Sequence, residues 1–494
     1  MSIAQGCSAG GIGGTVYGVC SAMTASLTFL GAARTVTGSR HLFTADGRRI
    51  LIDCGLFQER ELQARNWDPF LIAPSSIDAV ILTHSHLDHC GLLPRLVAHG
   101  FRGRVHCTEA TAGIAALVMA DSAHLQEEDA RFKEKRHAKE GRNRPDGYRP
   151  LYDTEQAATA AARLAPAPWH TPITIAPGIT AAFHPAGHIL GAAMVRVQAA
   201  DGTAVLFSGD LGPGGNPLVE GPVSNVGAPN LVTESTYGDR EHATSDVSAQ
   251  LDAILAAAWK RGGNVIIPSF AIERAQELLY RLRELHDAGR LAPWRIFLDS
   301  PMAISVLDVF RHNPASLAPG VRRMMAEGRS PFELPGLTLC ADRDASQAIN
   351  DIKRGAIIIA GAGMCNGGRI KHHLDHNLER PESTVLFVGY QASGTLGRQI
   401  LETRSREPGA RPAEVRLFGR PRLIRCTIEQ VHGFSGHAGK TQMLDWAMRL
   451  TPAPKRAFVV HGGETVTQAF AAELAARTGW NVVAPDYGQE IALE

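Results

Sequence analysis

The sequence predicts an α/β protein built from at least two folding units. Its 494 residues suffice for two large domains or about three of ordinary size. Short β-rich segments separated by glycine-rich turns recur from residue 27 to about 233, whereas amphipathic helices alternate with short, fully apolar strands from about 238 to 399. That alternation is typical of a parallel sheet covered by helices on both faces. We therefore expect residues 238–399 to form a separate domain.

The first 26 residues are rich in Gly, Ser and Ala, and we expect them to form a disordered leader, with Met23 as an alternative start. Strands of the first unit are predicted at 27–31, 41–44, 49–53, 79–83, 105–108, 179–183, 192–197, 204–207 and 231–233, with helices at 92–99 and 111–139. Strands of the middle segment are predicted at 264–268, 295–298, 356–359 and 384–388. The tail returns to strands at 423–428 and 456–460 and helices at 439–450 and 465–477.

Charge and cysteine content exclude several classes of protein. Lys and Arg number 50 against 49 Asp and Glu, so any nucleic-acid site is expected to be a local patch, such as the basic run 131–144. Eight cysteines without a C-x-x-C pair indicate reduced thiols in a cytoplasmic protein. Arg34 is the first basic residue, which argues against a secretory signal. No apolar stretch reaches the roughly 18 residues that span a bilayer.

The strongest chemical signal is the segment Thr83-His84-Ser85-His86-Leu87-Asp88-His89, which follows the apolar run 79–82. Side chains two residues apart in an extended segment point the same way, so His84 and His86 can reach one metal together. Asp88 and His89 come after the turn and can face a neighbouring metal. Imidazole with carboxylate suits Zn²⁺ and similar divalent ions.

Further ligands must come from other strand ends. The segment 183–191 offers His184 or His188, and periodicity alone does not choose between them. Asp210 ends an apolar strand between glycines, and its two carboxylate oxygens suit a bridge between two ions. His461 ends another apolar strand. Asp53 also ends a strand, where it is better placed to orient a ligand histidine than to bind metal.

Taken in order, L-I-D-C-G, H-x-H-x-D-H, A-G-H-I-L-G and S-G-D resemble the metallo-β-lactamase superfamily. The later segments Glu234-Ser-Thr-Tyr-Gly-Asp239, Pro268-Ser-Phe-Ala271, Arg274-Ala-Gln-Glu-Leu278, Phe434-Ser-Gly-His437 and Val460-His-Gly462 resemble its β-CASP branch. That branch includes the endonuclease of eukaryotic pre-mRNA 3′-end processing and its bacterial and archaeal relatives. The resemblance implies an αββα sandwich with an inserted α/β domain that carries a mainly parallel sheet. It divides the chain into the leader 1–26, the lactamase-type domain in two parts at 27–237 and 401–494, and the β-CASP domain at 238–400.

The resemblance also implies a ligand set. One metal would take His84, His86 and His188, the other would take Asp88, His89 and His461, and Asp210 would bridge them. Two Zn²⁺ ions are expected, with other divalent ions possible. They would activate a hydroxide that attacks the phosphorus of RNA, and His437, paired with Glu234, would be the general acid.

Single-stranded RNA is the substrate that the resemblance favours, because RNA-type members carry histidine at the position of His461. Arg274, Arg369, Gly367 and Gly368 are candidate phosphate contacts at glycine-rich turns or helix starts. A homodimer is compatible with the bacterial relatives. Two departures from the family pattern weaken a direct transfer of nuclease activity. Gly361-Ala-Gly-Met364 replaces a Ser-Ser-Gly-Met segment, and Glu273 stands where glycine is common.

Three alternatives stay open from the sequence. The same metal set also cleaves thioesters, lactams and other small esters, because the fold does not fix the substrate. A DNA nuclease of the same branch is the second alternative. The third is a non-catalytic RNA-binding relative, whose mark would be lost metal ligands.

Overall fold

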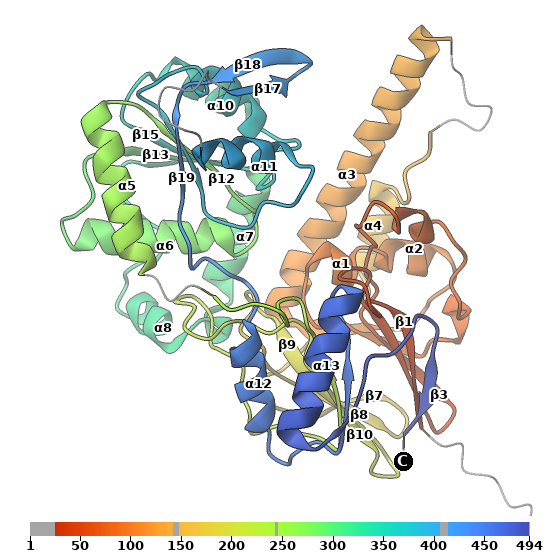
Figure 1. The fold of residues 1–494 in the computed structure, drawn as a ribbon. Helices are drawn as coiled ribbons and strands as arrows, with labels where there is room; N and C mark the ends of the chain where they lie inside the picture. Colours follow the sequence, from red (N-terminus) through yellow and green to blue (C-terminus); the bar gives the residue numbers. More distant parts are fainter. Residues whose placement is uncertain (1–24, 142–147, 243–245, 406–412, 494) are drawn as a thin grey trace, which may run out of the picture.

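The computed structural model describes residues 25–141, 148–242, 246–405 and 413–493. The predicted leader therefore lies outside the described residues except for its last two positions. Figure 1 shows two bodies, a larger one with two stacked sheets and a smaller one with a third sheet. Among the described residues, no helix is both long and apolar enough to cross a bilayer.

The first sheet has seven strands and is antiparallel at one side and parallel from β3 to β6. In sheet order its strands are β22 (Glu490–Ala492), β1 (Ser26–Gly31), β2 (Arg40–Ala45), β3 (Arg48–Ile52), β4 (Ala79–Ile81), β5 (Val105–Thr108) and β6 (Leu164–Ala167). Its outer face is covered by α1 (Leu87–Cys90), α2 (Leu93–Ala98), α3 (Glu109–Lys139) and α4 (Thr154–Ala161). The C-terminal half of α3 stands away from the body (Figure 1).

The second sheet also has seven strands, and it is parallel where β10, β11, β20 and β21 adjoin. In sheet order its strands are β21 (Asn481–Val483), β20 (Arg456–Val459), β11 (Asn230–Thr233), β10 (Ala204–Phe207), β9 (Ala193–Ala199), β8 (Ile179–Pro185) and β7 (Ile173–Ala176). Its outer face is covered by α12 (Lys440–Met448) and α13 (Glu464–Thr478).

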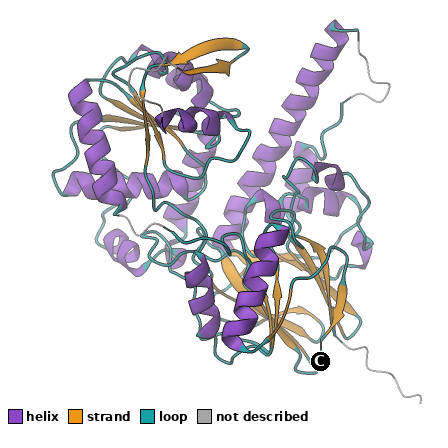
Figure 2. Ribbon diagram, in the orientation of Figure 1, coloured by secondary structure: helices purple, strands orange, loops and turns teal. Residues whose placement is uncertain are grey.

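Apolar side chains fill the space between the first two sheets, with Phe29 and Ile52 from one meeting Phe183, Val205 and Phe458 from the other. Figure 2 shows helices outside these strands, so the layers run helix, sheet, sheet, helix. The strands are short and apolar because both faces are buried, one in the sandwich and one under helices. This arrangement confirms the predicted αββα sandwich.

The third sheet has six strands, all parallel to their neighbours. In sheet order they are β14 (Leu337–Leu339), β13 (Arg295–Asp299), β15 (Ala356–Ala360), β12 (Val265–Pro268), β16 (Thr384–Phe387) and β19 (Thr427–Gln430). Around it lie α5 (Val247–Arg261), α6 (Arg274–Asp287), α7 (Pro301–His312), α8 (Pro319–Ala326), α9 (Arg343–Ala348), α10 (Ile370–Asn377) and α11 (Leu396–Leu401). Both faces are apolar and covered, which confirms the predicted parallel α/β domain.

The return to the first unit comes later than the sequence suggests. We predict one strand at 423–428, but the structure has two strands there, β18 (Arg420–Ile424) and β19. β18 pairs with β17 (Ala413–Leu417), whereas β19 belongs to the third sheet. The chain bends between them because the N–H groups of Arg425 and Cys426 both donate to the carbonyl of Leu378. We therefore propose that the inserted domain extends from 238 through β19, about thirty residues past the boundary at 400.

Candidate metal centre and active site

Seven predicted ligands lie at one edge of the sandwich, where several strands end. The loop after β4 carries His84 and His86, and the short helix α1 that follows it carries Asp88 and His89. Asp210 follows β10, His461 follows β20, and His188 lies on the turn between β8 and β9. Because strands of both sheets end at this edge, residues 372 positions apart in the chain come into contact.

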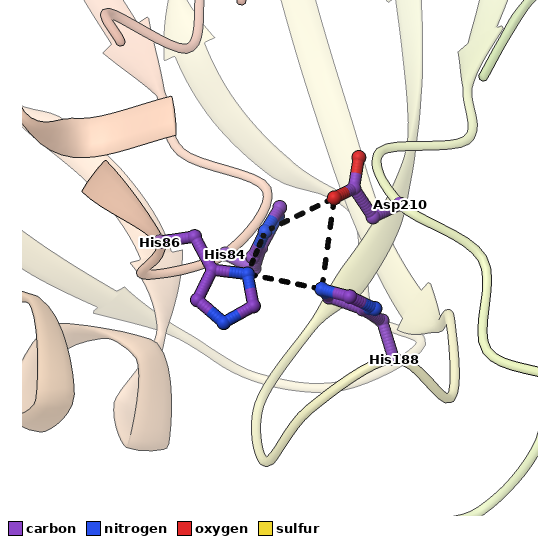
Figure 3. Close-up of side chains that lie close together, drawn as sticks. All are labelled: His84, His86, His188 and Asp210. Carbon is purple, nitrogen blue, oxygen red and sulfur yellow. Dashed lines mark hydrogen bonds and ion pairs between the residues drawn. The ribbon is translucent and has the colours of Figure 1, made fainter. Parts of the chain in front are cut away.

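The first group contains three imidazoles and one carboxylate oxygen (Figure 3). His86 Nδ1 lies 3.1 Å from His84 Nε2 and 3.0 Å from His188 Nε2. Asp210 Oδ2 lies 3.5 Å from His84 Nε2 and 3.6 Å from His188 Nε2. Four potential ligand atoms therefore surround one point.

The second group lies on the other side of the same carboxylate. His89 Nε2 and His461 Nε2 are 3.0 Å apart, and Asp88 Oδ2 lies 3.5 Å from His461 Nε2. Asp210 Oδ1 lies 3.3 Å from His89 Nε2 and 3.6 Å from His461 Nε2. Asp210 thus directs one oxygen to each group.

The donor spacing suits cations of the size of zinc. Tetrahedral bonds of roughly 2.0–2.1 Å place ligand atoms about 3.3–3.4 Å apart, and the observed separations of 3.0 to 3.6 Å bracket that value. Asp210 Oδ1 is buried and has no hydrogen-bond partner in the described part of the chain. A buried carboxylate oxygen without a donor is costly unless a cation faces it. The residues present therefore fit a divalent metal.

Asp53 contacts one of the clustered histidines. Its carboxylate accepts a 2.7 Å hydrogen bond from His89 Nδ1, which leaves His89 Nε2 directed at the cluster. The backbone N–H and hydroxyl of Thr83 donate to the same carboxylate. The chain just after Asp53 passes close to Asp88, and this is possible because residue 55 is glycine. A Cβ at Gly55 would lie 1.6 Å from the carbonyl oxygen of Asp88.

Two supporting contacts were missed from the sequence. His188 donates Nδ1–H to the carbonyl of Gly436 at 2.6 Å, and His461 Nδ1 lies 3.0 Å from the Thr236 hydroxyl. Both contacts direct Nε2 of the ligand at the cluster. Thr236 stands two residues after Glu234, within a segment that the sequence singles out, whereas a backbone carbonyl such as Gly436 leaves no signal in residue type.

Burial lowers the pKa of His84 and His188 well below the usual range and that of His86 to about 4. Neutral imidazole is the form that binds metal. Burial works in the same direction at His89 and His461, but there Asp210 and other carboxylates outweigh it and raise the pKa. The second group thus gathers the negative charge that a cation would neutralise.

His437 and Glu234 form the predicted pair beside the cluster. Both carboxylate oxygens of Glu234 lie 3.1 Å from His437 Nδ1, and His437 Nε2 lies 3.9 Å from Asp210 Oδ2. Burial opposes the imidazolium, but Glu234, followed by Asp210 and Asp88, raises the pKa of His437 to about 9. The ring therefore presents an N–H group towards the Asp210 carboxylate.

Two of the predicted substrate contacts, Arg369 and Arg274, have partners within the protein. Arg369 donates to the buried Asp299 and to two backbone carbonyls, so its guanidinium is engaged inside the third domain. Arg274 pairs with Glu277 at 2.7 Å. Gly368 lies against the carbonyl of Gly361 and Gly367 has open space around it, and their contact with phosphate stays a prediction.

The structure also separates the two histidines that periodicity left unresolved. His184 still belongs to β8 and lies 3.2 Å from His170, away from the ligand cluster. His188 lies beyond the strand, on the loop that turns towards the cluster. The structure therefore brings His188, and not His184, to the site.

Known protein families match the chain in three stretches. The Metallo-beta-lactamase superfamily matches residues 38–258, the Beta-Casp domain matches 275–400, and the Zn-dependent metallo-hydrolase RNA specificity domain matches 423–485. The first match covers strands of both sandwich sheets and reaches into α5, the second covers most of the third domain, and the third covers β19 together with the C-terminal strands β20 and β21.

Individual proteins resemble the chain over most of its length. It is 37% identical to Ribonuclease TTHA0252 of Thermus thermophilus, over 94% of this chain and 96% of that protein. It is 31% identical to Transcription termination factor FttA of Methanosarcina mazei, over 89% of this chain and 67% of that protein. A crystal structure of a protein of unknown function from Enterococcus faecalis, 12% identical with a TM-score of 0.54, covers 95% of this chain and 100% of that one and shows a shared fold. The chain belongs to the β-CASP, RNA-processing branch of the metallo-β-lactamase superfamily.

Proposed function

We propose that this protein is a metal-dependent ribonuclease whose seven clustered ligands hold two divalent cations, preferably Zn²⁺. The observation that carries the proposal is Asp210, whose two oxygens face two separate ligand groups. The match to an RNA specificity domain and the likeness to a named ribonuclease favour RNA as the substrate. The retained ligand set argues against a non-catalytic relative.

When bound, two such cations acidify a water molecule and neutralise phosphate oxygens. His84, His86 and His188 would hold one ion and Asp88, His89 and His461 the other. Asp210 fixes the separation of the two groups. Asp53 keeps the ring of His89 in the orientation that directs Nε2 inwards, so the protein side of the site is organised before substrate arrives.

His437 is proposed as the general acid that protonates the leaving sugar oxygen. Glu234 binds Nδ1 through both oxygens, which fixes the ring and leaves Nε2–H free to face a phosphodiester held over the cluster. The third domain adjoins this edge through α6, whose first turn contacts the His188 loop. A strand of RNA would lie between the two bodies.

Cleavage assays test the proposal. Single-stranded RNA should be cut, activity should disappear with EDTA and return with Zn²⁺, and a DNA strand of the same sequence should be cut far more slowly. His437→Ala should lower kcat by about 10²- to 10⁴-fold while metal content stays unchanged. His184→Asn is the matched control, because it alters a neighbouring buried histidine outside the cluster.

Turnover of small esters alone, with intact RNA, would refute the substrate assignment. Equal rates for wild type and His437→Ala would remove that residue from proton transfer.

A further inference from the structure

Two large aromatic side chains are left exposed at the carboxyl edge of the third sheet. Phe270 follows β12 and is 45% exposed, and Tyr390 follows β16 and is 55% exposed. These strands are adjacent and parallel, with Val265 opposite Thr384, so the two aromatics emerge at the same edge of the sheet. A single exposed aromatic needs no explanation, but two on neighbouring strand ends form a surface.

The glycine-rich turn after β15 joins them. The ring of Phe270 packs on Gly363 so closely that a Cβ there would lie 3.0 Å from two ring carbons. Gln391, the neighbour of Tyr390, donates to the carbonyl of Gly363 at 3.0 Å. The turn is thereby held from both sides. It presents backbone and the methyl group of Ala362 to solvent, without a hydroxyl group that would hold a phosphate.

This surface continues towards the catalytic pair. The loop that carries Phe270 leads into α6, whose N-cap residue Glu273 accepts a hydrogen bond from the N–H of Leu190 on the His188 loop. Beside the catalytic pair, the Arg240 guanidinium lies 5.2 Å from the Tyr237 ring centroid. The Tyr237 ring in turn packs edge to face with His437, at 5.6 Å between centroids. The loop after β12 thus joins this edge of the third sheet to the ligand cluster, and the Tyr237 ring lies against the proposed general acid.

The chemistry of this surface matches unpaired nucleobases. Every base has an apolar face that stacks on aromatic rings, and stacking does not depend on base identity. Resting on the ribonuclease function proposed above, we propose that Phe270 and Tyr390 form a stacking platform for unpaired bases of the RNA next to the scissile phosphate. In this chain, base stacking would supply binding energy for the substrate at the turn that lacks a hydroxyl group to contact phosphate.

Kinetics on RNA oligomers with a single abasic nucleotide test the platform. Phe270→Ala and Tyr390→Ala should each raise KM for unmodified RNA by about 5- to 150-fold. Phe270→Trp should keep KM close to the wild-type value, because tryptophan also stacks on bases. Phe270→Leu, which keeps apolar bulk over Gly363, should still lose most of the binding, so a packing role is distinguished from stacking.

The decisive experiment measures KM for wild type and for Phe270→Ala, each with intact RNA and with RNA that lacks one base. When the abasic position falls on the platform, wild type should show the same loss as Phe270→Ala, and the variant should lose nothing further. Phe418→Ala, an equally exposed aromatic (50%) between β17 and β18, is the matched control and should leave KM unchanged.

Three outcomes overturn the idea. An unchanged KM in both alanine variants refutes the platform, as does an equal loss at every abasic position. If wild type cleaves no RNA at all, the ribonuclease proposal fails and takes the platform with it. Metal content and melting temperature of each variant identify any loss that is due to misfolding.

Discussion

Glu273 offers a prediction that follows from burial. This side chain is 4% exposed at the start of α6, with a left-handed backbone φ of 63°. Its carboxyl accepts hydrogen bonds from the N–H of Leu190, on the His188 loop, and from the side chain of Asn216. It therefore joins the third domain to the loop that carries His188. Replacing it by Gln keeps the shape and removes the ionisable group.

Burial, followed by the charge of Glu277, raises the pKa of Glu273 from 4.5 to about 8. The unfolded chain loses this proton near its ordinary pKa, while the folded protein keeps it up to about pH 8. The unfolded state thus binds fewer protons in that window, and stability contributed by this group falls as pH rises through it. At 1.36 kcal/mol per pH unit the loss reaches up to about 5 kcal/mol.

Chemical unfolding of the zinc-loaded protein, followed by circular dichroism between pH 5 and 9, measures this effect. The difference in unfolding free energy between Glu273→Gln and wild type should grow steadily in favour of Gln up to pH 8. Titration of the metal ligands is common to both proteins and cancels. Glu327→Gln, which removes an exposed carboxylate paired with Arg329, is the control and should show no such trend. Parallel pH profiles for Glu273→Gln and wild type would refute the reasoning.

Two further substitutions test the supporting contacts. Asp53→Asn should weaken metal binding by about 10- to 100-fold, because His89 loses its charged acceptor; competition with a chromophoric chelator measures it, and unchanged affinity would contradict the orienting role. Arg369→Ala should lower the unfolding free energy by about 1–3 kcal/mol, because the buried Asp299 loses one partner while His373 remains, and KM for RNA should stay at the wild-type value. A raised KM with unchanged stability would restore Arg369 as a substrate contact.

The sequence reveals the site where its geometry is local. His84, His86, Asp88 and His89 follow one buried strand within six positions, so strand alternation and a single turn suffice to predict two groups. The choice between His184 and His188 depends on where β8 ends, and alternation carries no information about that point. The resemblance to a known family, and not periodicity, selected the residue that the structure places in the cluster.

The partner of Arg369 could not be predicted from the sequence. A glycine-rich turn followed by a helix is typical of phosphate binding, but Asp299 lies 70 positions earlier and is brought beneath the guanidinium only by the parallel sheet. The strand predicted at 423–428 fails for a similar reason. The carbonyl of Leu378, which turns the chain there, belongs to a different element and leaves no mark on the local pattern.

A crystal structure of the zinc-loaded protein with anomalous data collected at the zinc edge tests the central claim most directly. The account predicts two peaks about 3.5–4 Å apart, one on each side of the Asp210 carboxylate. A single peak, or two peaks of which only one touches Asp210, would contradict it.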